Sequence, residues 1–164
     1  MRHIISILLQ NEAGALTRVT SLFSTRGYNI ESLSVAPTED PLVSRLTMIT
    51  SGSDAVIDQI NKQLFKLVDV VNIADMTRGE HIERELLLMK VRLHDGANIS
   101  DIVSAAGARV LDDSPANFTL ELTGTGVQID NFMNTLGTRS EILAVVRSGA
   151  MAIARGETVL SSGI

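Results

Sequence analysis

A short stretch with the sequence NEAGAL, residues 11–16, has the residue types that can hold a small charged ligand. It follows an apolar run, IISILL at residues 4–9, and precedes a helical pattern, LTRVTSLF at residues 16–23. Small residues at a strand-to-helix turn leave the free N–H groups of the first helical turn uncovered, and such groups bind anions. The same composition also suits a tight corner that holds no ligand, and both interpretations stay open here.

An amino acid is a ligand that suits this turn. N–H groups between Ala13 and Leu16 can donate to its carboxylate, and the amide oxygen of Asn11 can accept from its ammonium group. Glycine at position 14 lets the backbone approach a ligand closely, whereas a bulky side chain there would fill the site. The pattern predicts binding and no reaction, because no evident reactive group accompanies these residues.

A second polar residue, Asn29, follows Gly27 and Tyr28 at the start of the next predicted strand, with Ile30 beside it. A pocket walled by Leu16 and Ile30 would favour a ligand with a short, branched side chain. Asn29 can equally well only cap the turn, so its contact with a ligand is one of two interpretations.

Residues that could perform catalysis are scattered along the chain and lack partners. His3, His81 and His94 have no metal-ligand partner at i+3 or i+4, no serine has an evident base, and the chain has no cysteine. The segment GTGVQI, residues 124–129, lacks the third glycine of a phosphate-binding loop and is predicted to turn a strand into a helix. We therefore predict no catalytic residue and no metal site. A small enzyme remains an alternative, since a lone loop arginine can serve a small phosphatase.

Hydrophobic periodicity predicts the elements that position the turn. The first half contains a strand at 3–10, a helix at 14–26, strands at 29–36 and 43–50, a helix begun by Ser53 or Asp54, and a strand at 68–76. The order is βαββαβ, with a turn at PTEDP between its second and third strands.

The same order returns about eighty residues later, after a charged segment at 77–85 that includes the linker. The second half contains a strand at 86–93, a helix begun by Asn98 or Ser100, a short strand at 109–111, a turn at 112–117, a strand at 118–123, a helix near 129–136 and a strand at 142–146. We therefore predict two domains, residues 1–77 and 78–164.

The predicted fold class is α+β, with two ferredoxin-like βαββαβ units in tandem, each an antiparallel sheet with its helices on one face. The right-handed crossover rule puts the first and third strands of each unit at the centre of its sheet. Units of this size are only marginally stable alone, and their open sheet faces and edge strands need cover. The fold therefore predicts a homodimer.

Composition excludes several classes of protein. Hydrophobic residues make up 45% of the 164 residues, which is enough for a packed core, and the net charge is −5 with no basic stripe for nucleic acid. No apolar run approaches the roughly 20 residues that a membrane span needs, and the N-terminus has no usable cleavage site. We expect a cytoplasmic protein with neither nucleic acid nor membrane as its partner.

Longer motifs resemble the small, regulatory subunit of acetolactate synthase, also called acetohydroxyacid synthase. They are NEAGALTRV at 11–19, FSTRGYNIESLSVAPT at 23–38, SRLTM at 44–48, QLFKLVDVV at 63–71, IERELLLMKV at 82–91 and VVRSGAMAIARGE at 145–157. The resemblance covers nearly the whole chain and is weakest over residues 94–117 and 124–141.

The resemblance implies that the first unit is an ACT domain, which pairs with another ACT domain and binds valine between the two. It also implies which residues hold valine, because the motif positions match. One protomer would supply Asn11, Gly14, Ala15 and Leu16, and the facing protomer would supply Asn29 and Ile30. The second unit would be the family's C-terminal domain.

On this resemblance the chain carries out no chemistry and needs no cofactor. It would associate with a large catalytic subunit that holds thiamine diphosphate, Mg²⁺ and FAD and condenses pyruvate with pyruvate or 2-oxobutyrate. The small subunit would activate that partner and confer feedback inhibition by valine in branched-chain amino-acid biosynthesis. The alternative is a free-standing amino-acid sensor such as a transcription regulator, although the sequence has no helix-turn-helix pattern and no basic helix.

Overall fold

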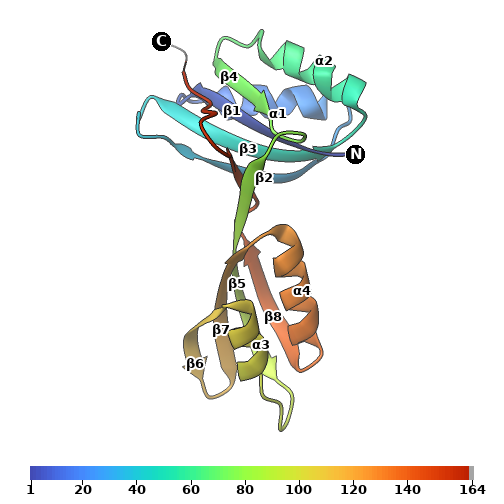
Figure 1. Ribbon diagram of the computed structural model, residues 1–164, viewed down its shortest axis with the longest axis vertical. Coiled ribbons are helices and arrows are strands. Elements are labelled where there is room, and N and C mark those ends of the chain that lie inside the picture. The colour runs from blue at the N-terminus through green and yellow to red at the C-terminus, as the bar shows by residue number, and fades with distance from the viewer. Residues whose placement is uncertain (163–164) are drawn as a thin grey trace. The chain divides into compact units, whose positions relative to one another are not determined.

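The computed structural model describes residues 1–162, and the contacts within the chain define two compact units (Figure 1). One unit comprises Met1–Ile82 together with the residues from Met151 onward, and the other comprises Glu83–Ala150. Residues 163 and 164, which the predicted second domain includes, lie outside the described residues.

The first unit has the predicted βαββαβ order. Its elements are β1 (Arg2–Gln10), α1 (Ala15–Ser24), β2 (Ile30–Pro37), β3 (Val43–Ser51), α2 (Asp54–Leu64) and β4 (Val70–Asp75). The strands pair antiparallel in the order β2-β3-β1-β4, so β1 and β3 are central, as the crossover rule predicts. Both helices cover the same face of this sheet (Figure 1).

The core of the first unit lies between the sheet and these helices. Successive strand residues point to opposite faces, so alternate residues of the central strands reach the helices. The buried residues of this core are Ile5, Ile7, Leu9, Ala15, Val19, Phe23, Leu46, Met48, Ile57, Ile60 and Leu64. The helix residues recur at intervals of three and four, which is why the amphipathic pattern predicted both helices.

The second unit repeats the order with its own core. Its elements are β5 (His81–Leu93), α3 (Ser100–Ala106), β6 (Arg109–Ser114), β7 (Asn117–Gly124), α4 (Gly126–Gly137) and β8 (Ser140–Arg147). The sheet order β6-β7-β5-β8 again places the first and third strands of the unit at the centre. Thr125 caps α4 in a reciprocal capping box with Gln128, so the GTGVQI segment does turn a strand into a helix.

Two strand boundaries and one additional strand differ from the sequence-based expectation. β5 begins at His81, inside the charged segment expected to include the linker. β6 continues to Ser114, which pairs with Asn117, so the expected six-residue turn shortens to a two-residue hairpin. A further strand, β9 (Met151–Ala154), pairs with β5 and was not expected.

The C-terminal segment also differs from the expected domain bounds, because it packs on the first unit. Arg155 N–H donates to the carbonyl of Glu80 at 3.0 Å. Nearer the end of the chain, the Arg45 guanidinium donates to the carbonyl of Leu160 at 2.8 Å. The predicted range 78–164 therefore spans residues of both units.

The segment after β9 covers the sheet face that the helices leave open. Arg45 on β3 and Asn72 on β4 both pair with Leu8 of β1, which puts all three side chains on that face. Asn72 donates to the carbonyl of Ser161 at 2.8 Å, and Leu8 is only 3% exposed. The chain thus supplies part of the cover that we expected from a partner protomer.

Replacing Phe23 with Ala tests the core of the first unit. Phe23 is fully buried, so its truncation should lower the free energy of unfolding by about 3–5 kcal/mol. Tyr28 is the one tyrosine of a chain without tryptophan, and it packs against this core. Its fluorescence in urea therefore reports on this unit.

Phe65 provides the matched control because its side chain is 56% exposed. Phe65→Ala should change stability by less than about 1 kcal/mol. Equal losses for the two variants would contradict the assigned core.

Candidate functional site

The NEAGAL turn joins β1 to α1 through a glycine in the left-handed conformation. Gly14 is the N-cap residue of α1, with φ 84° and ψ −11°, and no side chain caps the helix there. Glycine adopts this conformation without the steric penalty that a Cβ imposes. The turn therefore starts the helix with its first N–H groups uncovered by a capping side chain.

Two of these N–H groups are available to a ligand. Ala15 N–H donates to the carbonyl of Glu12 at 3.2 Å, and Arg18 N–H makes the first helical bond to Gly14 at 3.0 Å. The N–H groups of Leu16 and Thr17 have no acceptor among residues 1–162. Two adjacent donors at the positive end of a helix suit a carboxylate.

Asn11 is held in a fixed orientation beside the turn. Its backbone N–H donates to the carbonyl of Leu42 at 2.8 Å, and its side-chain amide nitrogen donates to the carbonyl of Pro41 at 3.0 Å. These bonds anchor the end of β1 to the turn between β2 and β3. They leave the amide oxygen Oδ1 to accept a hydrogen bond, which is the role predicted for Asn11 toward an ammonium group.

A cavity of about 250 Å³ lies beside the turn. Antiparallel register explains its composition, because Leu9 of β1 and Pro37 of β2 both pair with Ser44 of β3. The lining residues are Leu9, Gln10, Asn11, Glu12, Ala15, Leu16, Val35, Ala36, Pro37 and Ser44. The structure thus brings three of the predicted site residues, Asn11, Ala15 and Leu16, to one small cavity that both polar and apolar residues line.

The last residues of β2 and the start of β3 were missing from the prediction. Val35, Ala36, Pro37 and Ser44 enter the cavity because the far ends of β2, β3 and β1 meet in register. The hydrophobic pattern placed these strands but not their pairing. The turn at PTEDP, which sets the register, was the available indication.

Asn29 and Ile30 lie at the opposite end of β2 from this cavity. Ile30 begins the strand and Pro37 ends it, so at about 3.3 Å per residue they are roughly 20 Å apart. Asn29 is exposed, and its carbonyl accepts from the Thr50 hydroxyl at 2.8 Å. One chain therefore does not bring this pair to the turn, and their contact with the same ligand requires a facing protomer, which stays a prediction.

An ion pair that the sequence pattern did not predict supports the turn. Arg18 donates through Nε and Nη2 to the two carboxylate oxygens of Asp69, at 2.5 and 3.0 Å. Asp69 is 2% exposed, and its carbonyl accepts from Gln10 N–H at 2.8 Å. Hydrogen bonds from Arg18 lower the pKa of Asp69 despite the desolvation that opposes this shift. The pair fixes α1 to the end of β1 and to the loop before β4.

The fold of the chain itself requires glycine at position 14. A Cβ placed on it would lie 2.8 Å from Nη1 of Arg18, and its positive φ already disfavours other residues. The sequence pattern accounts for Gly14 only through the close approach of a ligand. Substitution at this position therefore disturbs the turn itself and is a poor test of binding.

Two family models together match most of the chain. The one described as an AHAS small subunit-like ACT domain matches residues 5–72, and the one described as the small subunit of acetolactate synthase matches residues 84–156. The fold and these matches define the first unit as an ACT domain.

Similar proteins extend this match over nearly the full length. The acetolactate synthase isozyme 3 small subunits of Salmonella typhimurium and Escherichia coli are 43% and 42% identical over 98% of this chain and 99% of theirs. The crystal structure of the acetolactate synthase small subunit from Thermotoga maritima matches with a TM-score of 0.86 at 33% identity, covering 96% of this chain and 99% of that one. The chain belongs to the family of acetolactate synthase small subunits.

Neither a membrane span nor a metal cluster is evident in the described part of the chain. Among residues 1–162, no helix is long and apolar enough to cross a bilayer. In the same range, no three histidine, aspartate or glutamate side chains are grouped so that they could hold a metal ion.

Replacing Arg18 with Gln tests the support of the turn. Because Asp69 would stay buried without its guanidinium partner, the midpoint of thermal unfolding at neutral pH should fall. Because folding lowers the pKa of Asp69, its ionised carboxylate stabilises the native state at pH values above the ordinary pKa of aspartate. This contribution to stability disappears as the pH falls through the lowered pKa. The difference between wild type and variant should therefore narrow below about pH 4.

Arg26 offers a matched control at the other end of α1, where its guanidinium contacts only the exposed helix end. Arg26→Gln should leave the unfolding midpoint nearly unchanged at every pH. If the difference in unfolding midpoint between the wild type and Arg18→Gln stays constant down to pH 3, ionised Asp69 is not the cause of the lower stability.

Proposed function

We propose that this chain is the regulatory subunit of acetolactate synthase and that its ACT domain binds valine. The observation that carries the proposal is a cavity of about 250 Å³ that is lined by Asn11, with its open amide oxygen, and by Leu16, whose N–H group and that of the next residue, Thr17, are free. These groups complement the carboxylate and the ammonium of an amino acid. Membership of the small-subunit family supplies the biological context.

Valine would bind between two first units of a homodimer. The N–H groups of Leu16 and Thr17 would hold its carboxylate, Asn11 Oδ1 would accept from its ammonium, and the apolar wall near Ala15 would contact its side chain. Asn29 and Ile30 of the facing protomer would close the site. Two-fold symmetry then gives two equivalent sites at one interface.

Regulation follows if valine binds one arrangement of the complex more tightly than another. A ligand with equal affinity for both arrangements shifts neither, so valine must stiffen or reorient the paired ACT domains. A coupling of about 1–3 kcal/mol is typical of such effects. The catalytic subunit, with thiamine diphosphate, Mg²⁺ and FAD, would carry out the condensation of pyruvate, and this chain would raise its activity.

A free-standing amino-acid sensor is the second candidate for an ACT domain. A free-standing sensor would explain the presence of the first unit but not that of the second. The family model for the second unit is that of the acetolactate synthase small subunit, which favours the proposed assembly with a catalytic partner.

Calorimetric titration of valine into the full chain tests binding. We expect saturation near one valine per protomer, and Asn29→Ala should weaken the affinity about 10-fold or more, since a hydrogen bond to a charged group contributes about 1.5–3 kcal/mol. Asn131→Ala, at an exposed position of α4, should bind valine as the wild type does. No heat in the wild type, alone or with the catalytic subunit, would refute the valine site.

Mixing the chain with purified acetolactate synthase catalytic subunit tests the regulatory role. We expect acetolactate formation to rise when the chain is added and to fall when valine follows. The isolated chain should form no acetolactate. The proposal would be contradicted if the chain alone formed acetolactate. It would also be contradicted if adding the chain did not change the activity of the catalytic subunit.

A further inference from the structure

Large apolar side chains that are exposed to solvent gather at one end of the first unit's sheet. Among residues 2–82 they occur at Val35, Leu42, Phe65 and Val68. Val35 lines the cavity beside the NEAGAL turn, and the other three lie in the connections before β3 and before β4. Both connections lie at the end where β1 stops, because Val43 pairs with Gln10 and Val70 pairs with Leu9. The opposite end of the sheet has no such side chain within this range.

Hydrogen bonds fix both connections beside the last residues of β1. The carbonyl of Leu42 accepts from Asn11 N–H, and the carbonyl of Asp69 accepts from Gln10 N–H, both at 2.8 Å. Leu42 and Val68, the residue before Asp69, therefore flank two consecutive residues of the chain. Their side chains are 74% and 85% exposed, so the core of the unit does not use them. Apolar side chains that gather in this way are typical of a surface that binds another protein.

The apolar end of the first unit, which comprises Leu42, Phe65 and Val68, is the surface left for a partner of another kind. The C-terminal segment lies on the open sheet face, where Arg45 and Asn72 bind its carbonyl groups. The edge strand β2 faces the second protomer in the proposed valine site. The outer faces of the helices are mostly polar, with the exposed residues Thr17, Arg18, Ser21 and Ser24 on α1 and Ala55, Asp58, Gln59 and Lys62 on α2.

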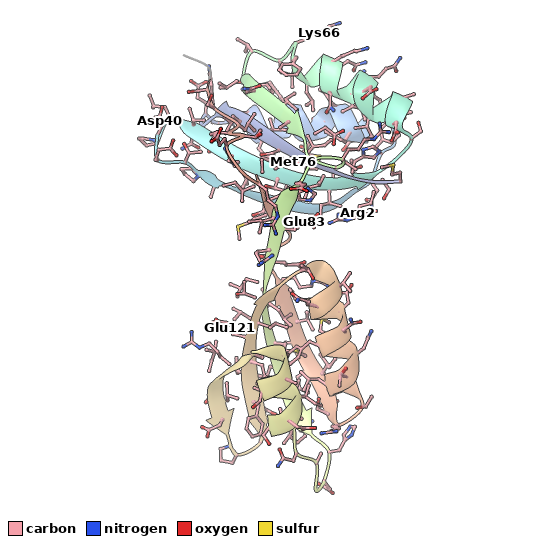
Figure 2. The ribbon with its side chains drawn as sticks, viewed as in Figure 1. Arg2, Asp40, Lys66, Met76, Glu83 and Glu121 are labelled. Carbon is pink, nitrogen blue, oxygen red and sulfur yellow. The ribbon has the colours of Figure 1, made fainter. Side chains whose placement is uncertain are left out.

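Acidic side chains border one side of the apolar end, and a lysine lies on the other. These exposed residues are Glu12, Glu39 and Asp40 beside the turn between β2 and β3, and Lys66 in the loop before β4. Figure 2 labels Asp40 and Lys66 on this unit, with Arg2 at the opposite end of the sheet from Asp40. A complementary partner surface therefore has apolar side chains with basic groups on one side and an acidic group on the other.

Groups at the proposed ligand site are bonded directly to both connections. Asn11 donates to the carbonyls of Pro41 and Leu42 through its side chain and its backbone. Arg18, in the first turns of α1, donates to Asp69 in the loop before β4. A ligand that orders the NEAGAL turn therefore acts on both segments that carry the apolar end. Coupling between two binding sites needs a shared element of this kind.

Resting on the proposed function, we propose that the apolar end of the first unit is the surface that binds the large catalytic subunit of acetolactate synthase. The side of Leu42 faces basic residues of that subunit, and the loop with Phe65 and Val68 faces apolar residues beside an acidic group. A second protomer does not occupy this surface, because the shared valine site places it along β2. Valine thus binds next to the contact that it regulates, and each ligand changes the affinity for the other by the same factor.

Binding of the full chain to immobilised, purified catalytic subunit, measured by surface plasmon resonance, tests the contact. Leu42→Asp and Val68→Asp should each raise the Kd about 10-fold or more, because a carboxylate replaces a side chain that the interface buries. Both positions are exposed in the free chain, so the unfolding midpoints should stay within about 2 °C of the wild type. Calorimetry on the free chain should show that Val68→Asp binds valine as the wild type does.

Val127→Asp on α4 and Val146→Asp on the edge strand β8 are matched controls, because both side chains are exposed on the second unit. Both variants should bind the catalytic subunit as the wild type does. Wild-type affinity in Leu42→Asp and Val68→Asp would overturn the inference, and so would a loss of binding confined to Val146→Asp. A wild-type chain that neither binds nor activates the catalytic subunit would refute the proposed function itself, and this inference with it.

Reversing one charge tests the acidic border of the apolar end. Glu39→Lys should slow association about threefold or more at low salt and have little effect at high salt, because salt screens the attraction between surface charges. Asp58→Lys makes the same change of charge near the start of α2, at the other end of the unit, and should associate at the wild-type rate. Equal slowing by the two variants would contradict the assigned border.

Discussion

The central strand β1 is buried on both faces, and the rest of the first unit is arranged around that constraint. Ile5 and Ile7 face the helices, while Ile4 and Leu8 face the other side, and all four are at most 3% exposed. A four-stranded sheet with helices on one face covers only half of this apolar surface. The C-terminal segment after β9 lies on the second face, so residues from both ends of the chain complete one unit.

Packing of β1 also determines what its two ends can do. At its C-terminal end the strand must stop and turn sharply, which places Gly14 at the helix start and leaves the N–H groups of Leu16 and Thr17 without acceptors among residues 1–162. Asp69 and Arg18 hold this exposed turn in place by pairing beneath it. At its N-terminal end His3 enters a pocket of acidic side chains. Apart from the buried Ser6, the polar side chains of β1 therefore lie at the two ends of the strand.

Much of the fold was predictable because it depends on local patterns. Helical spacing and strand alternation predicted every element of both βαββαβ units, and the small residues of NEAGAL between a strand and a helix predicted the turn at Gly14. Contacts between distant segments were not predictable in this way. Arg18 and Asp69 are 51 residues apart, His3 and Asp75 are separated by most of the unit, and the pairing of Arg45 with Leu160 spans 115 residues. No periodicity in a single sequence encodes such pairs. The assignment of Asn29 and Ile30 to a shared site rests on a second chain, which one sequence does not describe.

The return of the C-terminal segment has a consequence for how the protein is made. Because the ribosome synthesises the chain from the N-terminus onward, β1 to β4 and both helices of the first unit emerge long before residues 155–161. The sheet face containing Leu8 therefore lacks this cover until residues 155–161 have been synthesised, while the second unit can already fold. Such a delay exposes apolar surface to chaperones and to other nascent chains. A fragment that stops at residue 82 would lack this cover, and so would a chain that stops at residue 154.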